Sequence, residues 1–225
     1  MGMTFARLLY LIRTDHHRYH GGFKPLSLFK DLFFNRGFKI TVAYRIAHFL
    51  FQNRWGMALR LFNLYYYPLQ SRYCCEIPYA TRIGPGFYFG HVFGTIISVH
   101  SVLGKNVNMS HGVTLGKIAK GKRSGAPIIG DNVYIAPGAI VIGGIRLGNG
   151  TAVGANAVVT RDTPENAVVV GIPAEVISLA GSADYCIRTV EDESQGFSGT
   201  SLPGSSCEDD GLEEGSRPEK EKALV

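Results

Sequence analysis

The sequence has few cysteines and no long hydrophobic run. Its four cysteines are Cys74, Cys75, Cys186 and Cys207. Neither a C-x-x-C pair nor the spacing of a metal site occurs among them, which argues against a disulfide framework and predicts no metal. No stretch reaches the roughly 18 uncharged apolar residues of a spanning helix, and the apolar run 8–12 is too short for a secretory signal. We therefore expect reduced thiols and a cytoplasmic location.

Acidic residues are nearly absent from the first third of the chain. Residues 1–75 carry 11 Lys and Arg against 2 Asp and Glu, residues 76–180 carry 8 against 5, and residues 181–225 carry 4 against 11. The formal net charge of +5 therefore hides three different segments. Residues 181–225 combine acidic residues with Gly and Ser and have little to bury, so we expect a disordered acidic tail.

The middle segment is distinguished by a six-residue period. Read in steps of six, the chain places aliphatic residues at Ile129, Ile135, Val141, Leu147, Val153 and Val159. An amphipathic strand alternates every two residues and a helix repeats near 3.6, so neither gives this period. Three short strands and three corners make one coil, and stacked coils bury a continuous apolar core. The sequence predicts a mainly β fold, a parallel β-helix of hexapeptide repeats.

The same period continues upstream, with two irregularities. Its members there are Ile77, Ile83, Phe89, Ile97, Leu103, Met109 and Leu115. Two extra residues follow Phe89, and the segment 117–127 is basic, contains glycine and does not fit a hexapeptide. We interpret this segment as a loop extruded from a coil and place the β-helix domain at residues 76–180.

Apolar and aromatic residues recur at helical spacing between residues 26 and 70. Segments 35–37 and 53–56 have the composition of helix breaks, which gives two or three short helices. We expect residues 1–75 to form a basic, aromatic-rich helical cap over the open end of the β-helix. A compatible second interpretation is that these basic faces make a peripheral contact with an anionic membrane, at its inner face.

Two of the three histidines in the β-helix share a register. His91 stands two places after Phe89, and His111 stands two places after Met109. The period therefore puts them at equivalent positions one coil apart, within roughly 5–7 Å given the spacing of strands. His100 falls on another face, where we expect a structural or exposed side chain. His91 also lies at the irregularity in the repeat, and such breaks favour functional sites.

Three stretches resemble a known family: EIPYATRIGPGFYFGHVFG, VTLG before the loop, and VVVGIPAEVI near the end. On these stretches, residues 76 to about 177 are similar to the serine acetyltransferase-like branch of the hexapeptide-repeat acyltransferases. The resemblance implies a left-handed β-helix and a homotrimer with active sites between neighbouring subunits. It also implies acetyl-CoA as the donor and a hydroxyl as the acceptor. We expect no nucleic-acid partner.

Carried over by position, the resemblance assigns the general base to His91 and the carboxylate that orients it to Glu76. An imidazole within hydrogen-bond reach can take the proton of an alcohol as the thioester carbonyl is attacked. Backbone N–H groups near the loop are expected to meet the oxyanion. His111 lies in the motif SHGVTLG, which resembles a motif of acetyltransferases of exopolysaccharide and capsule synthesis. It is a candidate second catalytic or acceptor-binding residue, and the alternative is a packed histidine beneath His91.

Two positions depart from the family pattern. Serine acetyltransferases have an acidic residue before the base and a histidine before a proline in the loop, where this chain has Gly90 and Ala126. The resemblance implies that, in that family, these two missing residues bind the charged groups of the amino acid. We therefore predict an O-acetyltransferase acting on a sugar hydroxyl in polysaccharide or glycolipid synthesis. The alternatives are serine as the acceptor, in cysteine biosynthesis, and a non-catalytic β-helix scaffold.

For acetyl-CoA, the resemblance points to Gly116 near the thioester and to Pro137 and Ala155 along the pantetheine groove. Small side chains there let the thin arm lie along the coils. From charge alone, the candidates for its phosphate groups are cations of the extruded loop, Lys120, Lys122 and Arg123. The alternative for these cations is a solvated loop.

Overall fold

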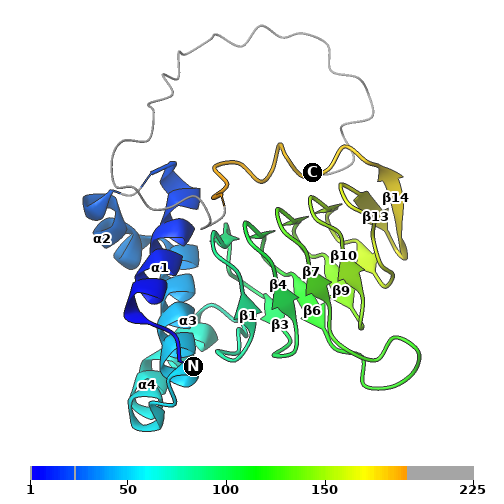
Figure 1. Cartoon of the computed structure of the whole chain (residues 1–225). Coiled ribbons are helices and arrows are strands. Elements are labelled where there is room, and N and C mark those ends of the chain that lie inside the picture. Colours follow the sequence, from blue (N-terminus) through cyan, green and yellow to red (C-terminus); the bar gives the residue numbers. More distant parts are fainter. Residues whose placement is uncertain (1, 23, 192–225) are drawn as a thin grey trace, which may run out of the picture.

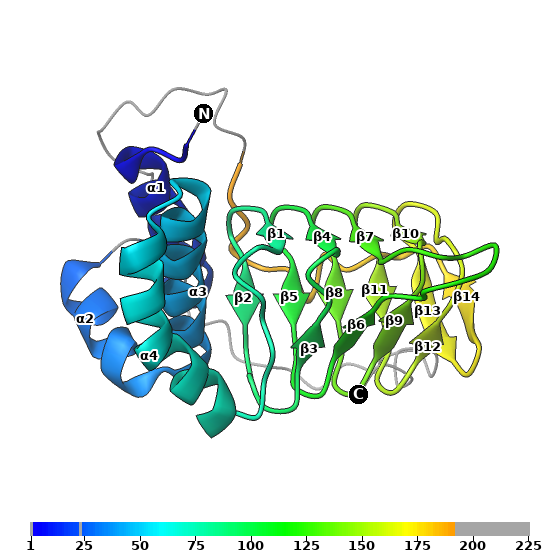
Figure 2. The same ribbon diagram turned by 90° about the horizontal axis from the view of Figure 1, so that it is seen from below.

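The computed structural model describes residues 2–22 and 24–191, in two parts that lie side by side (Figure 1). Four helices come first: α1 (Phe5–His20), α2 (Pro25–Phe34), α3 (Arg36–Gln52) and α4 (Gly56–Arg72). Short strands follow, in coils that stack in a row leading away from the helices (Figure 2). The predicted helical region followed by stacked hexapeptide coils is therefore confirmed.

Each coil contributes short strands to three sheets. The first contains β1 (Arg82–Ile83), β4 (Val102–Leu103), β7 (Ile128–Ile129) and β10 (Arg146–Leu147). The second contains β2 (Tyr88–Phe89), β5 (Asn108–Met109), β8 (Tyr134–Ile135), β11 (Ala152–Val153) and β13 (Val168–Gly171), all parallel, with β14 (Ala174–Ser178) antiparallel at its edge. The third contains β3 (Ile96–Ile97), β6 (Thr114–Gly116), β9 (Ile140–Ile142) and β12 (Val158–Val159).

The register of the coils follows the predicted period. In the first sheet Ile83 pairs with Leu103, Leu103 with Ile129, and Ile129 with Leu147. The last step is 18 residues, or three hexapeptides. The first step holds the two extra residues, and the middle step holds the extruded loop. Every member of the six-residue series is buried, so the side chains form one continuous core along the coils.

Several corners of the coils use a backbone conformation that most residues avoid. Asn106, Asn132, Asn156 and Asn166 have φ of 55–57°, a left-handed conformation that asparagine tolerates better than most side chains. The amide of Asn106 also donates to the side-chain oxygen of Asn132 in the next coil at 2.9 Å. Asparagine therefore makes tight corners here as glycine does, and it adds hydrogen bonds between coils.

A side chain of the helices donates hydrogen bonds to backbone carbonyls of the first coil. Arg45 of α3 is fully buried and donates to the carboxylate of Asp15 in α1 at 2.8 and 3.0 Å. Its guanidinium also donates to the carbonyls of Ile83 and Gly84, both at 2.6 Å. Burial acts to lower the pKa of Arg45, but the Asp15 carboxylate outweighs burial and holds that pKa above its ordinary value. One ion pair thus joins α1, α3 and the first coil.

The segment after β14 departs from the sequence prediction. Residues 181–191 run back along the coils to α1 (Figure 1). Tyr185 stacks on Tyr134 with 4.4 Å between ring centroids, and its carbonyl accepts from the Asn108 amide at 2.6 Å. Arg188 donates to the carbonyl of Tyr19 at 2.6 Å. The expected disorder is therefore wrong for residues 181–191, because ring stacking and hydrogen bonds hold them. The rest of the predicted tail, 192–225, lies outside the described residues.

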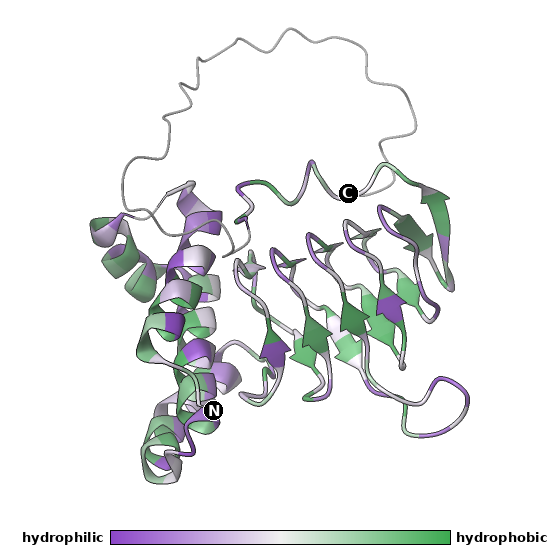
Figure 3. Ribbon diagram, in the orientation of Figure 1, coloured by the Kyte–Doolittle hydropathy of each residue, from purple (hydrophilic) through white to green (hydrophobic). Residues whose placement is uncertain are grey.

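The helices also have exposed hydrophobic side chains. Figure 3 shows hydrophobic residues on the outer turns of α2, and the exposed ones are Leu26, Phe29, Phe33 and Phe34, at 59–88% exposure. Within the described part of the chain, no helix is long and apolar enough to cross a membrane.

Candidate functional site

The two histidines that share a register lie next to each other. Phe89 of β2 pairs with Met109 of β5. The rings of His91 and His111 follow, with 6.0 Å between centroids and 73° between planes. Both side chains are exposed. The predicted neighbourhood of the two imidazoles, within roughly 5–7 Å, is confirmed.

The connection that carries His91 is longer than its counterpart in the next coil. Because Ile97 pairs with Leu115, residues 90–95 between β2 and β3 occupy the place of residues 110–113 between β5 and β6. The two additional residues have no place in the regular coil surface, as in a β-bulge. The two additional residues, which the sequence predicted as an irregularity, thus move the segment around His91 off the regular coil surface. This segment lies against the corner of α2 and α3.

Residues 90–93 face the corner between α2 and α3. Together they line an open pocket of about 440 Å³. Its helical side consists of Asp31, Phe34, Asn35, Arg36 and Gly37. The guanidinium of Arg36 lies over the ring of Phe93, 5.5 Å from its centroid. His91 is therefore an exposed imidazole in a pocket whose other wall carries a carboxylate and a guanidinium. Neither Asp31 nor Arg36 was predicted from the sequence as a site residue, since both belong to helices far upstream of the β-helix motif.

Close packing holds the helical corner against the coil. A Cβ on Gly37 would collide with the carbonyl oxygen of Phe89, so glycine is required where α3 begins against β2. The Tyr19 hydroxyl donates to the same carbonyl at 3.0 Å and accepts from the N–H of Phe89 at 3.2 Å. Helices α1 and α3 therefore fix the backbone two residues before His91.

Glu76 lies in a different place. It lines a second pocket, of about 520 Å³, with residues of α4 and of the stretch 74–80. No hydrogen bond or ion pair joins Glu76 to His91, both of which are described residues. Its role as the orienting carboxylate stays a prediction. Cys74 and Cys75 border this second pocket as free thiols, and burial raises the pKa of Cys75 to about 12.

Two of the residues predicted to bind the coenzyme continue the column of His111. The N–H groups that follow Pro137 and Ala155 donate to the carbonyls of His111 and Pro137, at 3.0 and 2.9 Å. These three residues therefore occupy one corner of three successive coils. Gly116 stands apart from that corner, at the far end of β6 and directly before the extruded loop.

The extruded loop, residues 117–127, leaves the coil between β6 and β7. Two backbone hydrogen bonds of 2.9 Å hold its ends together. All three cations predicted for phosphate binding are exposed: Lys120, Lys122 and Arg123. Arg123 also donates to the carbonyl of Thr160 at 2.7 Å, which anchors it to the coil.

A further cluster borders the pocket of His91. His16 and His20 of α1 both approach Asp31, which lines that pocket. This set was not predicted from the sequence, where metal-site spacing was sought only among the cysteines. The spacing of four between two histidines on a predicted helix was the signal that could have revealed it.

The chain is similar in sequence to a family of transferases and to individual serine acetyltransferases. Residues 126–161 match the family described as bacterial transferase hexapeptide (six repeats). The serine acetyltransferase of Bacillus subtilis is 36% identical over 157 residues, which cover 69% of this chain and 70% of the relative. The serine acetyltransferase of Synechococcus elongatus is 37% identical over 147 residues, covering 64% of this chain and 58% of the relative. The chain thus spans less than two thirds of the Synechococcus protein.

A solved structure is also similar. The serine acetyltransferase of Brucella abortus, in complex with coenzyme A, superposes with a TM-score of 0.65 at 27% identity. The match covers 77% of this chain and 68% of that chain.

These comparisons overturn one prediction. The relatives are serine acetyltransferases, so the predicted acceptor, a sugar hydroxyl in polysaccharide or glycolipid synthesis, is wrong. That prediction rested on Gly90 and Ala126, two positions within the β-helix. The pocket of His91 is also lined by Arg36 of the helical region. A motif read along the β-helix alone does not reveal a charged group that another part of the chain supplies.

Proposed function

The chain belongs to the serine acetyltransferase-like branch of the hexapeptide-repeat transferases, and on this premise we propose that it transfers an acetyl group from acetyl-CoA to the hydroxyl of serine. The observation that carries the proposal is the pocket that is lined both by the exposed imidazole of His91 and by Arg36. An amino acid acceptor needs a base for its hydroxyl and a cation for its carboxylate, and this pocket provides both.

In the proposed reaction, an imidazole nitrogen of His91 accepts the proton of the serine hydroxyl as the oxygen attacks the thioester carbonyl carbon. Backbone N–H groups stabilise the oxyanion that forms. The intermediate collapses as the carbon–sulfur bond breaks, and the CoA thiolate takes the proton back from the imidazolium. His111, with its ring 6.0 Å from that of His91, is the proposed second contact for the acceptor. The mechanism needs no covalent intermediate on the enzyme.

We propose that the pantetheine arm of acetyl-CoA lies along the corner column of His111, Pro137 and Ala155, with the thioester at the end where His91 lies. The family resemblance adds Gly116 as a residue near the thioester. Pro137 and Ala155 are small, half-buried residues, and small side chains leave room for the pantetheine arm. The coenzyme A complex of the Brucella relative supports this donor. Lys120, Lys122 and Arg123 are the proposed phosphate contacts, with Arg123 held near the coil by Thr160.

The direct test is thiol release from acetyl-CoA by the purified full chain. We expect release that depends on serine, with O-acetylserine as the product. Acetyl-CoA binding without serine-dependent turnover would instead favour the alternative of a non-catalytic scaffold.

Arg36→Gln tests the acceptor site. A charge-assisted hydrogen bond to a carboxylate contributes about 1.5–3 kcal/mol, so we expect the KM for serine to rise about 10- to 100-fold, with a smaller change in kcat. The variant should also lose the preference for serine over serine methyl ester, which has no carboxylate charge. Arg60→Gln, at an exposed arginine of α4, is the matched control. An unchanged KM in Arg36→Gln would remove Arg36 from the acceptor site.

The assembly is part of the same proposal. The family resemblance supports left-handed coils and a homotrimer, in which active sites form between neighbouring subunits. His91, His111 and the corner column are exposed or half-buried along one corner of the coils, where a second copy could complete the site. We also propose that the protein acts in the cytoplasm.

The exposed face of α2 is our proposed contact with an anionic membrane. Leu26, Phe29 and Phe33 line an apolar groove of about 670 Å³ that also includes Lys24 and Lys30. Apolar side chains beside lysines are the composition of helices that rest on anionic lipid.

Vesicle binding tests this face. Loss of one apolar side chain that lipid would bury costs about 1.5–3 kcal/mol, so Phe33→Ser should lower the affinity for phosphatidylglycerol vesicles about 10- to 100-fold in a sedimentation assay. Leu61→Ser, at an exposed leucine of α4, should bind like the wild type. We expect little binding to phosphatidylcholine vesicles. Equal binding of both variants would contradict a role for α2, and self-association through α2 would assign the face to a second copy.

A further inference from the structure

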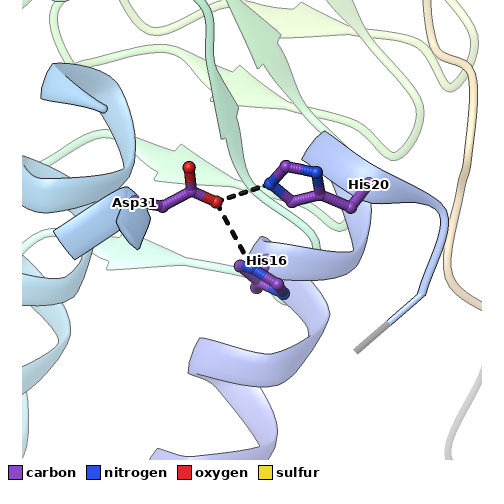
Figure 4. A group of neighbouring side chains, drawn as sticks. All are labelled: His16, His20 and Asp31. Atoms are coloured by element: carbon purple, nitrogen blue, oxygen red, sulfur yellow. Dashed lines mark hydrogen bonds and ion pairs between the residues drawn. The ribbon is translucent and has the colours of Figure 1, made fainter. Parts of the chain in front are cut away.

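We propose that His16, His20 and Asp31 form a binding site for one divalent transition metal ion of the zinc class, between α1 and α2. Figure 4 shows both imidazole rings directed at the same carboxylate oxygen. The site lies outside the acetyl-transfer chemistry, which does not require a metal.

The distances suit tetrahedral coordination. His16 Nε2 lies 3.3 Å from Asp31 Oδ2, and His20 Nε2 lies 2.5 Å from the same oxygen. The ligand atoms of all three residues lie within 4.8 Å of one another. In a tetrahedral zinc site with bonds of about 2.0–2.1 Å, ligand atoms are about 3.3 Å apart. The first pair already has this separation, and the second needs the ring of His20 to withdraw by about 0.8 Å.

The chain gives His20 the freedom for this adjustment. It is the last residue of α1, and its side chain is 34% exposed. Gly21, the C-cap, follows with φ +68°. His16 is by contrast fully buried and packs edge-on against Phe38, 5.3 Å between centroids. One ligand is therefore fixed by the core, and the other can close on an ion that arrives from solvent.

The residue types select the ion. Residues four apart on a helix lie on one face, so α1 presents two imidazoles side by side, and α2 adds a carboxylate. Two imidazoles and one carboxylate suit zinc, cobalt and nickel better than magnesium or calcium, which prefer oxygen ligands. The Ser27 hydroxyl lies 3.3 Å from His16 Nε2 and would give up that contact when the nitrogen binds metal. The exposed side of His20 leaves a fourth position for water.

A bound ion would fasten α2 to α1 beside the pocket of His91. Asp31 belongs to both places, since it lines that pocket, and α2 leads directly through Asn35 to Arg36. Two neutral imidazoles hydrogen-bonded to Asp31 would give a similar corner without any metal. Measured metal binding distinguishes the two arrangements, and it does so whether or not the protein acetylates serine.

The experiment uses the full chain without a polyhistidine tag, freed of metal with a chelator. We expect isothermal titration with Zn²⁺ to show about one ion per chain, and Co²⁺ to give the visible absorption of a tetrahedral complex. Zn²⁺ should raise the melting temperature, and Mg²⁺ should not. His20→Ala should lower zinc affinity at least about 100-fold, because even the loss of a group that orients a ligand costs 10- to 100-fold.

His17→Ala is the matched control, since it removes the adjacent histidine of α1 and leaves the three proposed ligands in place. It should bind Zn²⁺ like the wild type. Asp31→Asn provides a second test, because it keeps the shape of the side chain and removes its charge. It should also lower zinc affinity. Zinc binding that is equal in the His20→Ala and His17→Ala variants, or no binding by the wild type, would overturn the proposal.

Discussion

His91→Ala is expected to lower kcat/KM for acetyl transfer about 100- to 10,000-fold, which is the usual contribution of a general base. The serine hydroxyl would then lose the imidazole that takes its proton, and the ring of His111 is centred 6.0 Å from that of His91. The side chain is exposed, so its loss should leave the melting temperature within about 1–2 °C of the wild type. Acetyl-CoA binding should also remain.

The control for this variant is His100→Ala. His100 is another exposed histidine of the β-helix, and it lies outside the pocket. It should retain full activity. Thiol release from both variants, measured with saturating acetyl-CoA and a series of serine concentrations, gives the comparison. Full turnover in His91→Ala would show that another group acts as the base.

The second large effect is on stability. Arg45→Met leaves the carboxylate of Asp15 fully buried without its ion pair, and the carbonyls of Ile83 and Gly84 lose their donor. Removal of one partner from a buried pair costs about 3–5 kcal/mol. At about 2–4 °C per kcal/mol for a chain of this size, the melting temperature should fall by about 6–20 °C.

Thermal and urea unfolding measure this change. Arg82→Met removes an exposed arginine of β1 and should change the free energy of unfolding by less than about 0.5 kcal/mol. The double variant Arg45→Met/Asp15→Leu should recover part of the loss, because it leaves no charge buried alone. If Arg45→Met unfolded at the temperature of Arg82→Met, the pair would contribute little to the fold.

The features that the sequence predicted are those with a local period. Each aliphatic residue of the six-residue series, from Ile77 to Val159, is buried. This succeeds because one coil repeats the next, so a side chain and its neighbour in space are related by a fixed number of residues. The neighbourhood of His91 and His111 follows from the same rule. Pro137 and Ala155 were named from the family resemblance, and the structure places them in one corner of successive coils.

Features that depend on contacts across the chain could not be read in this way. Arg36 reaches the pocket of His91 because α3 packs on β2, and nothing in the local sequence of either residue states that contact. Residues 181–191 have a polar composition, yet Tyr185 and Arg188 find partners on β8 and α1. The composition of a segment indicates how much apolar surface the segment can bury by itself. It does not indicate the contacts that Tyr185 and Arg188 make with other segments.

The return of residues 181–191 has a consequence for how the molecule unfolds. A solenoid makes contacts only between neighbouring repeats, so its ends can fray one coil at a time. Here the segment that leaves the last coil crosses the intermediate ones, where Asn132 accepts from Ser182 and Asn106 from Val190, and it ends on α1. The segment that follows the last repeat is therefore held by α1 and by the early coils. Fraying of α1 would release contacts of this segment as well as those of the first coil.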